Sequence, residues 1–229
     1  MRAEVIAVEG PSAAGKTRAV RDVAPGLGAA PLAEAYERLR PRPPLGWRTP
    51  GELLRTERRL LQEEARRYRE ARELSRVGGL VVADTGFLGP LTYASSVAAM
   101  GLVSASRVVG LVEEARGLAR AGRWGLPDAL VYLRTSPAVR RRRAARDPRG
   151  HPASLQRRHQ DVGEVEFRFY RSTLARSFGP RFRFVSGDGP PELVAGRVRR
   201  AVGRLLAVRS PPPPVDPILD ALEAAATVP

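Results

Sequence analysis

The sequence predicts an α/β fold built on a doubly wound parallel sheet, and three observations support this. Short apolar runs typical of buried strands recur along the chain. Amphipathic stretches long enough for helices separate them, as parallel strands require. A glycine-rich stretch, GPSAAGKT at residues 10–17, joins the first run to the first helical stretch. Right-handed crossovers follow from this order of elements.

The predicted strands are apolar runs bounded by polar or glycine residues. The first is AEVIAV, which ends at a glycine. A weaker candidate is GAAPLAE at residues 28–34. The others are LVVA (80–83), ALVYL (129–133) and RFRFV (181–185).

Three stretches have helical periodicity. In the first, residues 52–74, apolar side chains recur at heptad-like spacing and Glu63 and Arg67 form an i,i+4 pair. Its apolar positions are Leu53, Leu54, Leu60, Leu61 and Tyr68. The second runs from Ser106 to Ala121, and the third from Pro191 to about Val208. These helices would cover the sheet.

Proline-rich segments occur inside the predicted domain, residues 1–209, and at its end. PRPPLGWRTPG at residues 41–51 is a loop, because proline supplies no backbone donor and restricts the residue before it. SPPPP at 210–214 is a stiff linker. Residues 215–229 form a short amphipathic helix, which either packs back on the domain or binds a partner.

Composition excludes several classes of protein and of metal site. The 229 residues contain no apolar run of the roughly 18 residues that a membrane span needs, so we expect a soluble, cytoplasmic protein without a membrane partner. The absence of cysteine rules out thiolate metal sites. The net charge of +15 would fit nucleic acid, but the arginines are interleaved with glutamates rather than with aromatic residues, which argues against a nucleic-acid partner.

GPSAAGKT fits the phosphate-binding pattern G-x-x-x-x-G-K-[ST] in its required place between a strand and a helix. Backbone N–H groups of the loop would hold ATP phosphates, Lys16 would reach the β and γ oxygens, and Thr17 would ligate Mg²⁺. Lys16 is the only lysine among 39 basic residues. An ordinary glycine-rich turn is the alternative. The predicted ATP-binding loop is Gly10, Pro11, Ser12, Ala13, Ala14, Gly15, Lys16 and Thr17.

Two carboxylates are candidates for catalysis. Asp84 ends a predicted strand, where it could ligate Mg²⁺ or act as a base. It could instead cap the segment that follows. Glu34 ends the weak second strand and could take a proton from an acceptor hydroxyl. It could instead be a first-turn glutamate of AEAYERLR.

An arginine run and four aromatic residues complete the candidate site. In RRRRAAR, Arg143 and Arg146 share a helix face at i,i+3 and could stabilise charge on the transferring phosphoryl group. Arg140, Arg141 and Arg142 are interpreted as solvated surface. The aromatic residues, which could line an acceptor pocket or belong to the core, are Tyr36, Trp47, Phe87 and Tyr93.

EGPSAAGKT and PDALVYLRTSPAVRRRRAAR together resemble the deoxynucleoside kinase and thymidylate kinase group of P-loop kinases. The resemblance implies a P-loop NTPase three-layer sandwich with five parallel strands and an arginine-rich helical lid at about 137–160. It implies that Arg143 and Arg146 are lid arginines and that Glu34 deprotonates the acceptor. It also implies that the segment Gly187 to Gly189, with Asp188, lies near the adenine.

The sequence departs from that group at DTGFLGPLTYA, where Thr85 replaces an arginine of the acceptor side. We therefore expect a Mg²⁺-dependent kinase that transfers the γ-phosphate of ATP to a nucleoside or nucleotide. A kinase of a non-nucleotide metabolite or antibiotic hydroxyl is the first alternative. An NTP-binding switch that acts through a protein partner is the second. ATP and a small-molecule acceptor are the expected partners, and a homodimer is left open.

Overall fold

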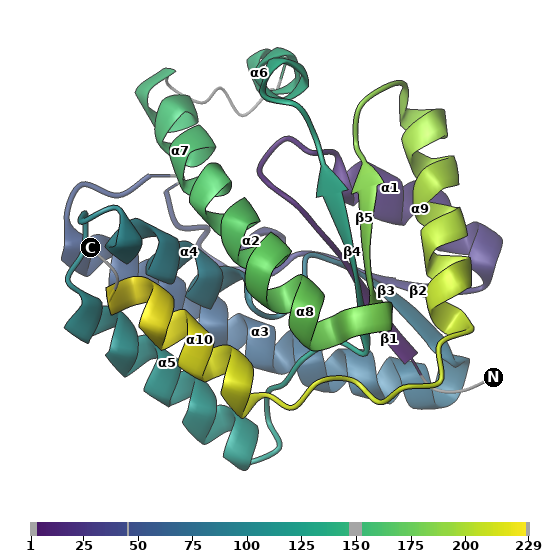
Figure 1. The fold of residues 1–229 in the computed structure, drawn as a ribbon, viewed down its shortest axis with the longest axis horizontal. Coiled ribbons are helices and arrows are strands. Elements are labelled where there is room, and N and C mark those ends of the chain that lie inside the picture. The colour runs from purple at the N-terminus through teal and green to yellow at the C-terminus, as the bar shows by residue number, and fades with distance from the viewer. Residues whose placement is uncertain (1–3, 45, 147–152, 228–229) are drawn as a thin grey trace.

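A single five-stranded sheet runs through the centre of the molecule in the computed structural model (Figure 1). The structure describes residues 4–44, 46–146 and 153–227, with the backbone alone for 153–160. All strands are parallel, in the order β2-β3-β1-β4-β5, which confirms the predicted sheet. The strands are β1 (Glu4–Glu9), β2 (Ala30–Leu32), β3 (Leu80–Asp84), β4 (Ala129–Arg134) and β5 (Phe182–Ser186).

Helices form a layer on each face of the sheet. One layer contains α1 (Lys16–Val23) and α9 (Pro191–Leu206). The larger layer contains α3 (Pro50–Gly78), α4 (Gly89–Ala99), α5 (Ala105–Arg120), α7 (Ala153–Phe169) and α10 (Asp216–Thr227). Shorter helices are α2 (Ala35–Arg38), α6 (Pro137–Ala145), α8 (Ala175–Phe178), the 3₁₀ turns Pro25–Leu27 and Gly179–Arg181, and the π-helical turn Tyr170–Leu174.

Burial on both faces explains why the strands are visible in the sequence as continuous apolar runs. In β1, Val5 and Ala7 belong to the core under the larger layer, and Ile6 and Val8 to the core under α1 and α9. All four side chains are fully buried. A strand covered on both sides carries no alternation of polar and apolar residues, as parallel sheets require.

The long helix α3 is defined at its start by side-chain caps. The Thr49 hydroxyl accepts from the Glu52 N–H at 3.2 Å, and the Glu52 carboxylate accepts from the Arg48 N–H at 2.7 Å. Such reciprocal bonds satisfy N–H groups that the first turn leaves free. The predicted Glu63–Arg67 pair is wrong, because Arg67 turns inward to Glu64. Glu63 instead pairs with Arg38 and Arg66 at 2.9 and 3.1 Å.

The helix α4 was not predicted, and its burial explains why. Most of its side chains lie in the interior, including Leu91, Ala94 and Val97, each 0% exposed. A helix that is covered on most sides lacks the polar face that reveals a helix in a sequence. Its position matters for function because α4 contributes Thr92 and Tyr93 to the cavity described below.

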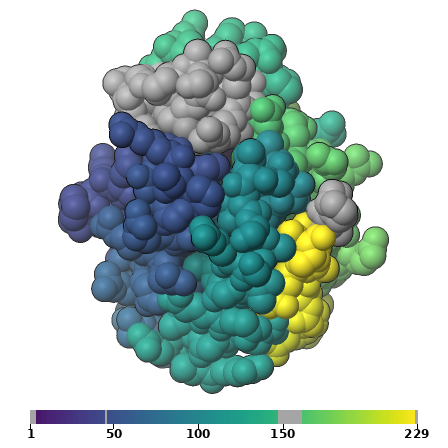
Figure 2. Space-filling model, turned by 90° about the vertical axis from the view of Figure 1, so that its left-hand side faces the viewer, coloured from purple at the N-terminus to yellow at the C-terminus, as the bar shows by residue number. Residues whose placement is uncertain are grey.

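The C-terminal helix α10 packs on α4 and α5, and Figure 2 shows it in yellow beside the teal surface. Its side chains Ile218, Leu219 and Leu222 are fully buried in the core under the larger layer. Arg116 of α5 donates to three of its carboxylates at 3.0–3.1 Å. Among the described residues, none of the helices has the length and apolar character needed to cross a membrane.

Candidate active site

The loop Gly10–Thr17 curls at the carboxyl end of β1 and leads into α1. Gly10 and Gly15 have φ values of 143° and 96°, which only glycine adopts readily, and Ala13 has φ 61°. A Cβ on Gly10 would lie 2.7 Å from the Leu133 carbonyl oxygen. This tight curl presents backbone N–H groups at a helix N-terminus, which is a ready anion site. The geometry therefore fits a phosphate-binding loop.

The side chain of Lys16 lies along the same loop. Its ammonium donates to the carbonyl oxygens of Gly10 at 2.8 Å and Pro11 at 3.2 Å. A compact ammonium fits between these two oxygens, where a planar guanidinium would not. Lys16 also lines the cavity on the other side of the loop.

Arg143 of α6 connects the phosphate loop to the segment after β5. Its guanidinium donates to the Ala14 carbonyl at 2.7 Å and to the Gly187 carbonyl at 2.9 Å. Asp188 in that segment accepts from the Ser136 N–H at 2.9 Å. These bonds place Arg143 and Gly187 beside the loop, with Asp188 next to the start of α6.

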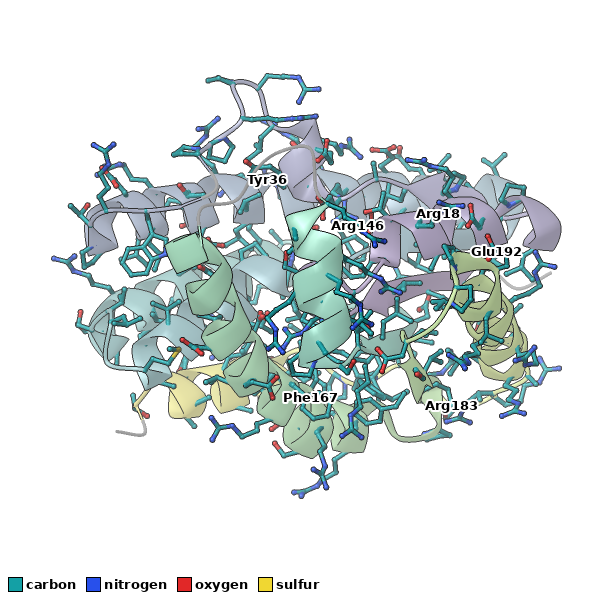
Figure 3. The ribbon with its side chains drawn as sticks, turned by 90° about the horizontal axis from the view of Figure 1, so that it is seen from above. Arg18, Tyr36, Arg146, Phe167, Arg183 and Glu192 are labelled. Carbon is teal, nitrogen blue, oxygen red and sulfur yellow. The ribbon has the colours of Figure 1, made fainter. Side chains whose placement is uncertain are left out.

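Arg141 and Arg142 are exposed, as expected, whereas Arg140 and Arg146 differ from expectation. Arg140, which was interpreted as surface, is 4% exposed and donates to Glu164 of α7 at 3.0 Å. The helix ends at Ala145, so Arg146 follows it with an exposed side chain and does not share an inward face with Arg143. Figure 3, viewed from above, shows Arg146 at this end of α6. Residues 147–152 of the expected lid lie outside the described residues.

A cavity of about 470 Å³ opens between α6, α7 and the ends of β4 and β5. Arg140 contributes to its wall, as do Pro11 of the phosphate loop and Asp188. The Nε atom of Arg140 is buried without a hydrogen-bond partner among the described residues. This cavity adjoins the phosphate loop on the side of Gly187, where the resemblance places the adenine.

Asp84 and Thr17 are the oxygen ligands expected for Mg²⁺. Asp84 is 2% exposed, and its Oδ1 atom has no hydrogen-bond partner among the described residues. Alternation along β3 places Asp84 on the same face as Val82, toward α1. It does not cap α4, whose N-cap is Leu88. A buried, unpartnered carboxylate oxygen near the phosphate loop fits a hard cation that prefers oxygen ligands.

A second cavity, of about 290 Å³, lies on the other side of the phosphate loop between β1, α2, α3, α4 and α7. Glu34, Tyr36, Trp47 and Tyr93 line it together with Lys16, as the sequence analysis expected for an acceptor pocket. Hydrogen bonds fix the positions of three of these side chains in the cavity wall. The Tyr36 hydroxyl donates to the Pro43 carbonyl at 2.7 Å, and Trp47 Nε1 donates to the Tyr93 hydroxyl at 3.4 Å. We call this space the acceptor cavity.

Phe87 is not part of the acceptor cavity, which corrects the prediction. Its side chain is 0% exposed and packs edge-on against Tyr68, with ring centroids 5.5 Å apart. Its carbonyl accepts from the indole N–H of Trp124 at 3.1 Å. Phe87 is therefore a core residue, because the chain turns inward after β3 before α4 begins.

The turn after β3 has a strained backbone and is held by hydrogen bonds from a buried arginine of α3. Thr85 has φ 64°, which is rare for a β-branched residue. Arg67, fully buried in α3, donates to the carbonyls of Asp84 at 2.8 Å and Thr85 at 3.3 Å and pairs with Glu64. Arg67 thus supplies a positive charge beneath the strand end, where Thr85 itself carries none.

Sequence reasoning missed four glutamates in the acceptor cavity: Glu9, Glu57, Glu64 and Glu166. In α3 the residues Leu53, Glu57, Leu60 and Glu64 form one stripe at spacings of four and three, and all line the cavity. That stripe was the available signal, because two glutamates occupy positions that the pattern otherwise assigns to leucine. Because arginines are interleaved with this stripe, the sequence pattern indicated a solvent-exposed helix face.

Burial shifts the ionisation of these carboxyl groups. It raises the pKa of Glu64 to about 7, although the Arg67 guanidinium opposes the shift. Burial likewise raises the pKa of Glu166 to about 7, opposed by the Thr92 hydroxyl, which donates to it at 3.1 Å. The pKa of Glu57 rises well above its ordinary value through burial and the nearby charge of Glu166. Glu9 shifts in the same direction by burial, against the attraction of Lys16.

No protein-family model matches the sequence, and no curated protein matches it. Among solved structures, deoxyadenosine kinase from M. mycoides with bound dATP superposes with a TM-score of 0.70 at 15% identity, covering 87% of this chain and 99% of that chain. Two further structures of deoxyadenosine kinase from M. mycoides, one with dCTP and one with the products dCMP and a flexible dCDP, give TM-scores of 0.64 at 14% identity. Each covers 87% of this chain and 98% of that chain.

Proposed function

We propose that this chain, which has the deoxynucleoside kinase-like P-loop fold, is a Mg²⁺-dependent kinase that transfers the γ-phosphate of ATP to a hydroxyl of a small molecule. The observation that carries the proposal is the position of Lys16, whose ammonium belongs to the phosphate loop and also lines the acceptor cavity. The γ-phosphate of the donor and the acceptor would therefore both lie beside the Lys16 ammonium, which brings them together for in-line transfer.

Glu34 has the position of a base in this scheme. It lies at the N-terminus of α2 in the wall of the acceptor cavity that also contains Lys16. As the acceptor oxygen forms its bond to the γ-phosphorus, the bond from phosphorus to the β-phosphate oxygen breaks and ADP leaves. The hydroxyl proton passes to the Glu34 carboxylate. Lys16 and the loop N–H groups offset the negative charge on the transferring group.

Thr17 and Asp84 are the residues that would hold Mg²⁺. When bound, the ion supplies positive charge that neutralises the β and γ oxygens of the nucleotide. Arg143 already donates to the carbonyls of Ala14 and Gly187, so its role in this arrangement is to hold the phosphate loop against the nucleotide side. Asp188 and Gly187 would contact the base or ribose of ATP from that side.

The test is ADP formation with ATP and Mg²⁺ across a panel of nucleosides, nucleoside monophosphates and hydroxylated metabolites. We expect acceptor-dependent turnover that Lys16→Ala lowers by about 10³-fold or more. Arg18→Ala is the matched control, because Arg18 lies two residues after Lys16 in α1, is exposed, and among the described residues is bonded to Asp22 alone, at 3.2 Å. Transfer that persists in Lys16→Ala would end the proposal. ATP binding without response to any acceptor would favour a nucleotide switch instead.

A further inference from the structure

The acceptor cavity has an unusual charge balance. Five glutamates line it, and Lys16 is the only basic residue in its described wall. The ammonium of Lys16 is held at the phosphate-loop end by the carbonyls of Gly10 and Pro11. Among the described residues, the rest of the cavity is lined by acidic, hydroxyl-bearing, aromatic and apolar side chains.

Two of the five glutamates have their charge compensated by neighbouring groups. Glu64 pairs with the buried guanidinium of Arg67. Glu9 accepts from the Gly86 N–H at 2.6 Å and is attracted by Lys16. Glu34 also makes contacts in the wall and is assigned above to the acceptor hydroxyl. These three lie toward the strand ends and the phosphate loop, where the transfer reaction would occur.

Glu57 and Glu166 are different. Glu57 is 5% exposed, lines the cavity, and makes no hydrogen bond or ion pair with any residue that the structure describes. Glu166, on α7 opposite, has the neutral hydroxyl of Thr92 as its hydrogen-bond partner. The two carboxyl groups are close enough for the charge of Glu166 to raise the pKa of Glu57. They form a pair of acidic groups that face a shared space, and among the described residues neither makes an ion pair, although the charge of Lys16 attracts Glu166.

Glu57 lies away from the reaction centre, whereas Glu166 is close enough to Lys16 and Glu9 to feel their charges. Glu57 is seven residues before Glu64 on α3, which is about 10 Å along the helix axis. Glu64 pairs with Arg67, and Arg67 donates to the carbonyl of Asp84, the last residue of β3. Glu64 therefore lies near the end of this strand. A ligand group bound at Glu57 would thus lie at a distance from the hydroxyl that receives the phosphoryl group, on the far side of Glu166 from Lys16 along the cavity wall.

The walls between these two ends suit an organic molecule. Tyr36, Trp47, Tyr93, Tyr132 and Tyr170 line the cavity. Burial raises the pKa of Tyr132 and Tyr170, so both stay neutral and present aromatic surfaces. Aromatic faces attract cations, and a buried carboxylate is stabilised when a hydrogen-bonding cation is brought to it. An anionic phosphate on the acceptor would instead meet five carboxyl groups.

We propose that the phosphoryl acceptor is an organic cation, a hydroxylated small molecule whose protonated amine or guanidinium binds between Glu57 and Glu166 while its hydroxyl faces Glu34. This inference rests on the proposed kinase function and adds the class of substrate to it. The cation would complete the charge balance of the cavity, and the carboxyl groups would give up their protons as it binds.

The first experiment compares acceptors that differ in charge alone. Rates of ADP formation are measured with amino sugars and aminocyclitols, each beside its N-acetylated counterpart, and with deoxyadenosine and dAMP. We expect kcat/KM for an amine to exceed that for its neutral counterpart by about 100-fold, because the uncharged group leaves the pair unmatched. Equal or faster turnover of the N-acetylated compounds, deoxyadenosine or dAMP would overturn the inference.

The second experiment uses Glu57→Gln and Glu166→Gln, which keep side-chain shape and remove charge. For an amine acceptor, each variant should lower kcat/KM by about 30-fold, mainly through KM, with little effect on a neutral counterpart. Glu73→Gln is the control, because Glu73 is exposed on the same helix. A parallel loss for charged and neutral acceptors would show a structural role instead and contradict the inference.

Calorimetry of the same amines without ATP separates this inference from the kinase proposal. Amine binding that Glu57→Gln abolishes, without ADP formation, would support the cation site and reject the kinase. Turnover of deoxyadenosine by a protein that does not bind amines would support the kinase and reject the cation site. Binding of Mg²⁺ alone that is lost in Glu57→Gln would assign the pair to a metal ion and also reject it.

Discussion

At the scale of single residues, the candidate site depends on where charge is matched and where it is not. The Lys16 ammonium lies between two carbonyl oxygens of its own loop, and Arg67 neutralises Glu64 under the end of β3. Glu57 and Glu166 face the acceptor cavity without such a partner among the described residues. Buried carboxyl groups without a paired cation cost stability, and a bound cation would offset that cost.

Glu34 is tested by Glu34→Gln, which keeps the side chain's shape but cannot accept a proton. We expect kcat for phosphoryl transfer to fall by about 10³-fold while KM for the acceptor changes little, since proton transfer matters in the transition state. Steady-state kinetics measure both constants. Glu37→Gln in the same short helix is the control. Unchanged kcat in Glu34→Gln would assign the base elsewhere, with Asp84 as the next residue to test.

The raised pKa of the Glu166 carboxyl group predicts how the free energy of unfolding depends on pH. Its pKa is raised from 4.5 to about 7 in the folded protein, so the folded state binds the extra proton between these values. Stability therefore falls as pH rises through this window, by about 3 kcal/mol for this group. The charged and titratable groups that face Glu166 are Glu9, Lys16, Glu57, Tyr132 and Tyr170.

Urea unfolding at pH 5 and pH 7.5 checks this dependence. The free energy of unfolding should fall less between the two pH values in Glu166→Gln than in the wild-type protein, because glutamine does not titrate. Glu73→Gln should behave like wild type. Identical slopes for wild type and Glu166→Gln would mean that the carboxyl group titrates near its ordinary value in the folded state.

At the scale of elements, the segment after β5 is fitted closely against the start of α6. A Cβ on Gly187 would lie 2.1 Å from the Thr135 hydroxyl oxygen and 3.3 Å from the Ala14 carbonyl oxygen. Arg143 joins the carbonyls of Ala14 and Gly187 across this contact. Position 187 thus has no room for a Cβ beside the Thr135 side chain, and the Ala14 carbonyl of the phosphate loop lies in close contact with the same position.

Gly187→Ala should therefore destabilise the protein by about 1–3 kcal/mol and weaken ATP binding, since the segment must move away from the phosphate loop. Thr135→Ala added to it should recover part of the loss, because it removes the colliding hydroxyl. Thermal unfolding and ATP titration measure both effects. Gly203→Ala is the control: nothing lies within 4 Å of its Cβ position on α9, so it should be neutral or stabilising. A neutral Gly187→Ala would contradict the contact.

At the scale of the whole molecule, the C-terminal helix supports the acceptor cavity from outside. α10 packs on α4, and α4 carries Thr92 and Tyr93 of the cavity wall. Leu219 is fully buried in the same core cluster as Leu91 of α4. Loosening α10 should therefore affect the acceptor side of the site more than the phosphate loop, which lies on the far side of the cavity.

Leu219→Ala tests this connection. We expect a loss of about 2–5 kcal/mol in unfolding free energy and a higher KM for the acceptor, with ATP affinity nearly unchanged. Leu193→Ala, at a leucine that is 45% exposed, should change stability by about 0.5 kcal/mol or less. Chemical denaturation and initial rates give the two quantities. A larger effect on ATP than on the acceptor would contradict the proposed support.

The sequence predicted the sheet well because each buried parallel strand is a continuous apolar run, as in AEVIAV and ALVYL. The phosphate loop was equally visible, since its chemistry depends on consecutive residues. The acceptor side was not, because Glu57 and Glu166 lie 109 residues apart and come together only in the wall of the acceptor cavity, to which α3 and α7 both contribute. Helix α4 was not predicted, and the choice between acceptor pocket and core stayed open for Phe87, because burial rather than local pattern decides their places.

The most direct test of the account is the fate of the γ-phosphoryl group. ATP carrying ¹⁸O in that group is incubated with Mg²⁺, the protein and an amine acceptor, and the products are analysed by mass spectrometry. The account predicts a labelled phosphoryl group on the acceptor, in an amount that falls with Lys16→Ala. Label found only in inorganic phosphate, with the acceptor unchanged, would contradict it.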